Sequence, residues 1–186
     1  MGAGLYDGSC RRDTRVKAAL AHRKIGFFLV LASVLALGVA WWVENILHIM
    51  PCELCLVERW PWRILLLVGL IDIVLPGVAG GPVLWLSVPL LVASIGLAFC
   101  HAGVEWGWWP SPLPGCHAPH IHGTTMAERL ASMPLLPGKP CDYPTYLVPA
   151  VPLSMSVLGG LYAAAVLGIF VVMKQRAKQA VRRIFH

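Results

Sequence analysis

Four cysteines fall into two groups whose spacing could support thiol–disulfide chemistry. Cys52 and Cys55 form a Cys-Glu-Leu-Cys motif, and Cys116 and Cys141 stand 25 positions apart further along the chain. Thiols at Cys-x-x-Cys spacing exchange disulfides, bind zinc, hold clusters or attach haem. Haem attachment requires a histidine directly after the second cysteine, where this chain has Leu56. Disulfide exchange and metal binding therefore remain for the first pair.

Two alternatives to redox chemistry follow from the same residues. A histidine-rich run could complete a zinc site with the ligands Cys116, His117, His120 and His122. Alternatively, both pairs could be inert disulfides. A Cys-x-x-Cys disulfide closes too short a loop to stabilise a fold much, whereas a Cys116–Cys141 bridge could contribute about 3.5 kcal/mol. A structural role is therefore more reasonable for the second pair than for the first.

The composition indicates that a membrane protein carries these cysteines. Of 186 residues, 58% are hydrophobic and only 13% are charged, whereas a soluble domain has about 25% charged residues. Apolar segments of spanning length predict four transmembrane helices, at about residues 25–43, 57–75, 83–101 and 153–173. We therefore predict an all-α membrane protein, a four-helix transmembrane bundle that forms a single domain over residues 1–186.

The second predicted span is the weakest of the four. Its uninterrupted apolar run, residues 64–75, is short and contains Asp72. It reaches spanning length only if the helix also carries Arg59 and Arg63, and charged residues within a membrane are costly and often functional. Pro61 either kinks this helix or lies in its first turn, which would move the cysteines into the loop above.

Basic residues set the expected topology. Six of the 15 Lys and Arg residues lie in the tail 1–24 and five lie in the tail 174–186. Positive charge flanking membrane spans stays in the cytoplasm, so both termini are expected there. The net charge of +6 is then a topology signal and not a sign of nucleic-acid binding. The outer loops are residues 44–56 and 102–152.

This topology places both cysteine pairs in an oxidising compartment. Outside a bacterial inner membrane, cysteines are expected to form disulfides, and two pairs on two loops are typical of a redox protein. If a helix begins just before Cys52, one stripe of its surface carries Cys52, Cys55, Arg59 and Arg63. The helix N-terminus and a neighbouring cation favour a thiolate, whereas Glu58 opposes it. Cys10 falls on the cytoplasmic side, and Cys100 lies at the outer end of the third span.

These motifs resemble the DsbB family, the quinone-linked oxidases that regenerate the periplasmic thiol oxidant DsbA. Residues 51–59, Pro-Cys-Glu-Leu-Cys-Leu-Val-Glu-Arg, resemble the family signature Pro-Cys-x-Leu-Cys-x-x-x-Arg. Residues 101–107 resemble the start of its second outer loop, and Cys141-Asp142 and Ser154-Met155 resemble later motifs. The match covers roughly residues 25–173. Vitamin K epoxide reductases have the opposite order, with the loop pair before the Cys-x-x-Cys motif.

The resemblance implies a protein-disulfide oxidase of the bacterial inner membrane, with redox loops that face the periplasm. Cys116 and Cys141 would oxidise a DsbA-like thioredoxin-fold partner, with the mixed disulfide at Cys116. Cys52 and Cys55 would pass the electrons to ubiquinone or menaquinone. An interloop bond between Cys141 and Cys52 would be an intermediate, in which Cys55 is a thiolate that faces the quinone.

Two further residues and two resting disulfides complete the expected site. Arg59 matches the quinone-site arginine of the family, and His101 matches a position near the same site. Expected partners are the periplasmic protein, the quinone and membrane lipid, without nucleic acid. Loop placement and spacing lead us to expect two disulfides at rest, Cys52–Cys55 and Cys116–Cys141.

Two other functions remain compatible with the sequence. The first is a non-enzymatic membrane metal-binding protein that uses Cys116 and the three loop histidines. The second is a redox-inert scaffold of four spans. Within the long loop, residues 125–128 form a capping-box pattern. Met126, Leu130 and Met133 then share one face, which indicates a short helix lying on the membrane between the two loop cysteines.

Overall fold

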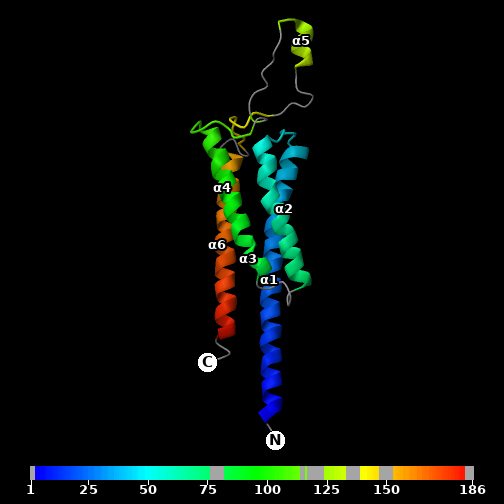
Figure 1. Ribbon diagram of the computed structural model, residues 1–186, viewed down its shortest axis with the longest axis vertical. Helices are drawn as coiled ribbons and strands as arrows, with labels where there is room; N and C mark the ends of the chain where they lie inside the picture. Colours follow the sequence, from blue (N-terminus) through cyan, green and yellow to red (C-terminus); the bar gives the residue numbers. More distant parts are fainter. Residues whose placement is uncertain are drawn as a thin grey trace.

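The computed structural model describes residues 3–75, 82–113, 116, 124–132, 139–146 and 153–182. In the first helix, side chains are described for Val16 and from residue 19 onward. These residues form six helices, α1 (Ala3–Asn45), α2 (Glu53–Val74), α3 (Pro82–Trp85), α4 (Ser87–Glu105), α5 (Met126–Ala131) and α6 (Met155–Arg182). The four long helices lie side by side, and α1 begins at the same end where α6 finishes (Figure 1). The described part contains no strand beyond an isolated bridge between Tyr146 and Ser154. The prediction of an all-α fold is confirmed.

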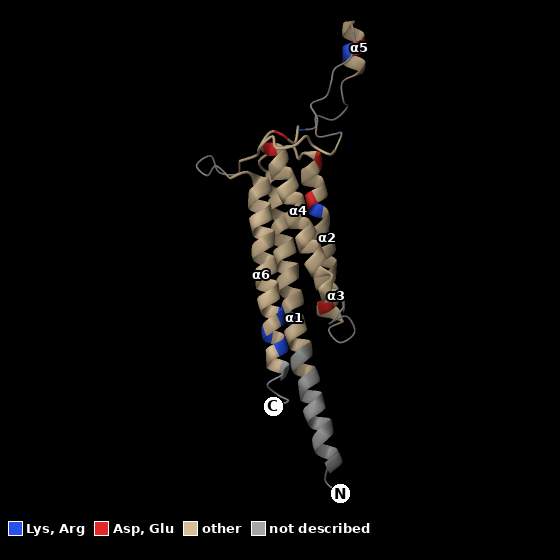
Figure 2. Ribbon diagram, turned by 60° about the vertical axis from the view of Figure 1, so that its left-hand side comes forward, with Lys and Arg blue, Asp and Glu red and all other residues tan. Residues whose placement is uncertain are grey.

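Three helical segments are long and apolar enough to cross a membrane: Ala19–Asn45, Val83–Glu105 and Met155–Ala180. They overlap the predicted spans 25–43, 83–101 and 153–173. The predicted span 57–75 corresponds to α2, which has 22 residues and is therefore about 33 Å long. Its charged residues keep α2 outside this group, although it lies alongside the other helices (Figures 1 and 2). A fourth span thus stays a prediction.

Apolar side chains from all four long helices form the core. The buried residues are Ile25, Leu29, Ala32, Trp62, Leu65, Leu84, Leu91, Ala163, Val166 and Phe170. The outward faces of the same helices are also apolar, for example at Phe27, Leu67 and Phe99. A helix that is apolar on all sides is typical of a membrane environment. Lys and Arg residues gather on α6 near its C-terminal end, and most acidic residues lie toward the other end (Figure 2).

Two glycines allow α1 and α2 to approach closely. A Cβ atom on Gly26 would lie 2.9 Å from the carbonyl oxygen of Gly69, and a Cβ on Gly69 would lie 2.9 Å from that of Gly26. Small residues at such contacts let helix backbones pack tightly where lipid removes the hydrophobic drive for association. This contact holds α2, and with it the Cys-x-x-Cys motif, against α1.

Helix α2 begins earlier than it would if Pro61 lay in its first turn. Cys52 is the N-cap, the helix starts at Glu53, and it continues through the buried Pro61. Placing Pro61 in the first turn was therefore wrong. The missing hydrogen-bond donor of a proline is tolerated in a membrane helix when neighbouring groups satisfy the backbone. Cys52 and Cys55 consequently lie at a helix N-terminus.

The predicted loop helix is present as α5, and its capping box is formed. The Thr125 hydroxyl accepts a hydrogen bond from the Glu128 backbone N–H, and the Glu128 carboxylate accepts one from that of Thr125. However, α5 stands beyond the end of the bundle instead of lying across it (Figure 1). Met126 and Leu130 are exposed, and Met133 lies outside the described residues. Local capping determines the helix but not its placement.

We predict that Gly26→Ala destabilises the bundle, because the new Cβ would also lie 3.1 Å from Asp72 Oδ2. Overpacking of this kind costs about 1–3 kcal/mol. The measurement is the apparent melting temperature of the detergent-purified protein. Gly38→Ala on the same helix is the matched control, since a Cβ there has no atom within 4 Å. Equal melting temperatures for the two variants would contradict the close contact.

Candidate active site at the cysteine end of the bundle

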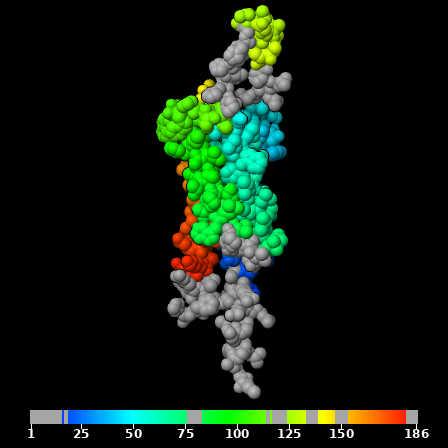
Figure 3. Space-filling model, in the orientation of Figure 1, coloured from blue at the N-terminus to red at the C-terminus, as the bar shows by residue number. Residues whose placement is uncertain are grey.

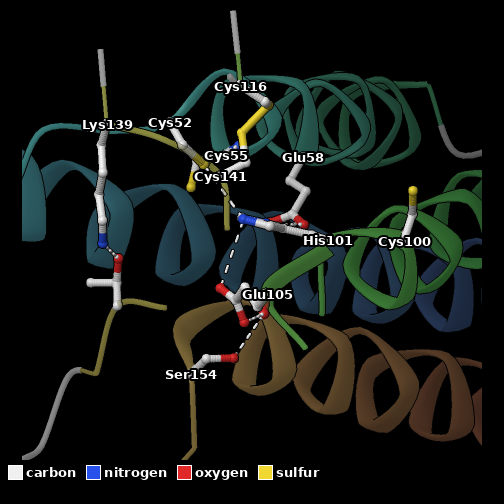
Figure 4. A network of polar contacts seen from close by, with 12 residues as sticks. Cys52, Cys55, Glu58, Cys100, His101, Glu105, Cys116, Lys139, Cys141 and Ser154 are labelled. Carbon is white, nitrogen blue, oxygen red and sulfur yellow. Dashed lines mark hydrogen bonds and ion pairs between the residues drawn. A yellow bond between two sulfur atoms is a disulfide. The ribbon is translucent and has the colours of Figure 1, made fainter. Parts of the chain in front are cut away.

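The four cysteines of the two pairs pack into one buried cluster. Cys52, Cys116 and Cys141 are 4%, 3% and 1% exposed, and the half-buried Cys55 packs against them. Cys116 and Cys141 form a disulfide, which Figure 4 shows beside Cys55. Cys100, which precedes His101 on α4, lies outside this cluster (Figure 4). The fold therefore brings together two pairs that are distant in the sequence.

The expected resting disulfides are present for one pair only. The Cys116–Cys141 bond is formed, as predicted, but Cys52 and Cys55 are free thiols. The Cys52 Sγ instead accepts a hydrogen bond from the Cys55 backbone N–H at 3.2 Å. A Cys-x-x-Cys motif at a helix N-terminus accommodates both oxidation states, and this structure holds the reduced one. The expectation of two disulfides was thus wrong for the state described here.

Cys52 is the sulfur that the structure favours as a thiolate. It occupies the N-cap of α2, where unpaired N–H groups and the helix dipole stabilise negative charge. Hydrogen bonds from the Cys55 thiol and backbone N–H lower the pKa of Cys52, against the effect of burial. The same thiol hydrogen bond, together with burial, raises the pKa of Cys55. In the reduced pair, Cys52 therefore loses its proton before Cys55.

His101 of α4 connects this pair to two carboxylates. Its Nε2 lies 3.5 Å from Cys52 Sγ, and its Nδ1 lies 3.0 Å from Glu58 Oε1. Glu105 Oε1 is 3.7 Å from the same Nε2 (Figure 4). Because a carboxylate only accepts hydrogen bonds, Nδ1 carries the proton in this arrangement. If Nε2 also carries a proton, the imidazolium donates toward a Cys52 thiolate, whereas a neutral imidazole presents the Nε2 lone pair to the Cys52 thiol.

The second carboxylate ties α4 to α6. Ser156 donates a hydrogen bond to Glu105 Oε2 at 2.6 Å and lies 2.8 Å from the Ser154 hydroxyl. Glu105 is almost fully buried, with its side chain 3% exposed. Sequence patterns did not single out Glu105, and they indicated Glu58 only as a charge opposed to a thiolate. Helical spacing could have indicated both residues. Glu58 follows Cys55 by three positions and Glu105 follows His101 by four, so each shares a helix face with a predicted site residue.

The two arginines of the predicted stripe behave differently. Arg59 Nη1 forms an ion pair with Glu44 Oε2 of α1 at 2.7 Å, and both side chains are partly buried. Arg63 is exposed and stacks on Trp60, with its guanidinium carbon 5.5 Å from the ring centroid. The stripe therefore holds as far as Arg59, and Arg63 points to the outside of the bundle.

A cavity of about 570 Å³ opens beside the cysteine pair. It lies within the size range of pockets for small organic ligands. Its apolar wall comes largely from α1 and α6, and α2 and α4 contribute many of its polar groups. Helices α2 and α4 form one continuous face in Figure 3. The polar residues at the cysteine side are Cys52, Cys55, Glu58, Arg59, His101 and Glu105. Both predicted ligand-binding residues, Arg59 and His101, therefore line the same cavity as the cysteine pair.

Among the described residues, Cys52, Cys55 and His101 could together hold a metal ion. The zinc ligands considered from the sequence were different ones. His117, His120 and His122 lie outside the described residues, and the Cys116 sulfur is bonded to Cys141. The structure thus points to a different set of potential ligands from the one that the sequence indicated.

Comparisons with known proteins match most of the chain to one family. The family model described as "Disulfide bond formation protein DsbB" matches residues 22–173. A curated protein of Rickettsia prowazekii (strain Madrid E), "Uncharacterized protein RP370", is 28% identical over 86 residues, which are 46% of this chain and 49% of that protein. The chain thus matches about half the length of this relative. No solved structure matches the chain.

We predict that alkylation of the reduced protein begins at Cys52 as the pH rises. Only the thiolate reacts, and the pKa of Cys52 is lowered whereas that of Cys55 is raised. The pH midpoint for Cys52 should therefore lie below the ordinary thiol value of about 8.5, and that for Cys55 above it. Mass spectrometry after iodoacetamide pulses measures both midpoints in one sample.

The Cys55→Ala variant tests the cause of this shift. It removes the thiol that donates to Cys52, so the Cys52 midpoint should move to higher pH. Cys100→Ser should leave the midpoint unchanged because Cys100 lies outside the cluster. A Cys55 midpoint below that of Cys52 would show that the assignment of the thiolate is reversed.

Proposed function

Because the chain belongs to the DsbB family, whose members act in disulfide bond formation, we propose that it is a quinone-dependent protein-disulfide oxidase. It reoxidises a DsbA-like thioredoxin-fold protein of the periplasm through Cys116 and Cys141, and passes the electrons to Cys52 and Cys55. The observation that carries this proposal is the packing of both pairs in one buried cluster. The cavity beside Cys52 and Cys55 is the place where these electrons would pass to a quinone.

The proposal includes a topology. The chain forms one domain with four spans in a bacterial inner membrane, α2 being the fourth. Both tails lie in the cytoplasm and the cysteine end faces the periplasm. In support, α1 begins and α6 ends at the same end (Figure 1), and this end carries the basic residues of both tails. Trp106, Trp108 and Trp109 are exposed near the opposite end, as aromatic residues are at a membrane surface.

The partner reaction uses the Cys116–Cys141 disulfide. A partner thiolate attacks Cys116, forms a mixed disulfide and releases Cys141 as a thiolate. The second partner thiol then attacks the partner's own sulfur in that bond, which releases Cys116 and leaves the partner oxidised. Two electrons and two protons pass to the loop pair. Thiol–disulfide exchange proceeds through such mixed species.

The internal reaction passes the electrons to the first pair. Cys141 attacks Cys52 of a Cys52–Cys55 disulfide, which forms the interloop bond and releases Cys55. Cys116 then attacks Cys141, restores the loop disulfide and leaves Cys52 and Cys55 reduced. The end state has the bonds that this structure contains, a Cys116–Cys141 disulfide beside two free thiols. The cluster therefore has the composition expected immediately before the first pair is reoxidised.

The cavity residues fit a quinone in size and chemistry. A quinone needs an apolar pocket with polar groups for its carbonyl oxygens, and the cavity provides Arg59 and His101 within a mostly apolar wall. Bound ubiquinone or menaquinone supplies the acceptor for two electrons and two protons. His101 Nε2 can take the proton of Cys52, while Glu58 holds the imidazole through Nδ1. The Arg59 guanidinium, which is paired with Glu44, supplies hydrogen-bond donors next to the site.

Quinone reduction by a reduced DsbA-like protein tests the function. With the purified chain in detergent and a soluble ubiquinone analogue, we expect turnover, which is measured as the loss of quinone absorbance. Cys55→Ser should abolish turnover because the Cys52–Cys55 disulfide cannot form. Cys100→Ser is the control, since Cys100 lies outside the cluster. Quinone reduction that persists in Cys55→Ser would refute the proposed route.

A covalent trap tests the direction of the same route. A reduced partner that lacks its resolving cysteine should accumulate as a mixed disulfide with the oxidised chain, because it has no second thiol to attack its own sulfur in that bond. Peptide mapping of the complex on a non-reducing gel should place this bond at Cys116. A bond at Cys52 would mean that the partner delivers electrons to the other pair.

We predict that Arg59→Ala slows quinone reduction by about 10²-fold, the loss typical for one charge-stabilising donor. Formation of the mixed disulfide at Cys116 should be unaffected. Arg59→Lys should recover only part of the rate, because a point charge does not reproduce the planar guanidinium fork. Arg63→Ala, one helical turn further on and exposed, is the matched control. Equal rates for the two alanine variants would argue against a role for Arg59.

A further inference from the structure

We propose that the reduced Cys52–Cys55 pair and His101 form a binding site for a thiophilic divalent cation such as Zn²⁺. The three ligand atoms lie within 4.8 Å of one another. Two thiolates and one imidazole are the ligand set of known zinc sites that keep a fourth position open. Binding would release the two thiol protons without any change of oxidation state, because Zn²⁺ has no redox chemistry.

The spacing of the atoms matches a tetrahedral ion. Bond lengths of about 2.3 Å to sulfur and 2.1 Å to nitrogen place two such ligands about 3.6 Å apart. Cys52 Sγ and His101 Nε2 are separated by 3.5 Å. The site therefore needs only small adjustments at these two ligands, and the half-buried Cys55 completes the thiolate pair from the same helical turn.

The orientation of His101 is already that of a metal ligand. Its Nδ1 faces Glu58 Oε1 at 3.0 Å, which leaves the Nε2 lone pair directed toward the cysteines. A carboxylate that holds the distal nitrogen of a ligating histidine fixes its tautomer and strengthens its basicity. Glu58 would serve this role without touching the ion.

Glu105 lies beside the site, although it is not one of the three residues whose ligand atoms come together. Its Oε1 lies 3.7 Å from His101 Nε2, and its other oxygen accepts the hydrogen bond from Ser156. The carboxylate is thus held in place with one oxygen directed to the site. Two thiolates neutralise the charge of a divalent cation, which matters because His101 and Glu105 are almost fully buried and an unpaired charge there would be costly.

Binding of the cation would depend on the oxidation state of the pair. A Cys52–Cys55 disulfide removes both thiolate ligands, so only the reduced chain can bind the ion. A bound ion, in turn, withdraws both thiolates from disulfide exchange. If the proposed oxidase function holds, Zn²⁺ would therefore inhibit quinone reduction. The binding itself requires neither quinone nor partner, so the test below is independent of that function.

Metal titration of the purified full chain in detergent tests this site. After reduction with a phosphine under anaerobic conditions, we expect one Zn²⁺ per chain in competition with a chromogenic chelator. Co²⁺ as a second probe should give a thiolate-to-cobalt charge-transfer absorption. The same chain with its disulfides formed should bind neither ion. Absence of stoichiometric binding to the reduced chain, or equal binding to the oxidised chain, would overturn the proposal.

Variants identify the ligands. His101→Ala and Cys52→Ser should abolish stoichiometric binding, and Glu58→Gln should weaken it about 10–100-fold, the effect typical of a residue that orients a ligand. Helix content by circular dichroism checks that each variant is folded. The triple variant His117→Ala/His120→Ala/His122→Ala should bind as the unchanged chain does. Loss of binding in the triple variant and its retention in folded His101→Ala would overturn the proposal and place the ion in the loop.

Discussion

A buried sulfur that can carry negative charge imposes the main constraint on this structure. Cys52 is 4% exposed, so a thiolate there loses almost all of its hydration. The N-terminus of α2 compensates, because the Cys55 backbone N–H donates to the sulfur and the helix dipole has its positive end there. Further along the same helix, the Gly26–Gly69 contact lets α2 pack closely against α1.

The charged groups around this sulfur also explain how the helices are oriented. Charges within a membrane bundle persist only when partners from neighbouring segments compensate them. Glu44 of α1 pairs with Arg59 of α2, and Glu58 of α2 pairs with His101 of α4. Glu105 then accepts a hydrogen bond from Ser156 of α6. Each contact joins a different pair of helices, so polar groups, and not only apolar packing, determine which faces meet at the cysteine end.

Sequence patterns predicted the local features of this site and missed the contacts between helices. Motif spacing identified Cys52 and Cys55 at a helix start, and hydropathy located three apolar helices that the structure contains. The capping box of α5 was also readable, because it involves neighbouring residues. The pairing of Glu58 with His101 could not be predicted, because residue spacing defines a face of one helix but not which other helix packs against that face. For the same reason the stripe from Cys52 could not show that Arg63 turns outward.

Burial of the loop disulfide separates the two halves of the proposed reaction. A sulfur of a partner protein must approach Cys116 in line with the bond that it breaks, yet Cys116 and Cys141 are only 3% and 1% exposed. Exchange with Cys52, by contrast, needs the cluster as it stands. In the proposed reaction, Cys116 would therefore have to leave the cluster to meet the partner and return to it for the second exchange. On the proposed route, the Cys52–Cys55 pair would then exchange only with Cys141, and a reduced partner would not reach Cys52 directly.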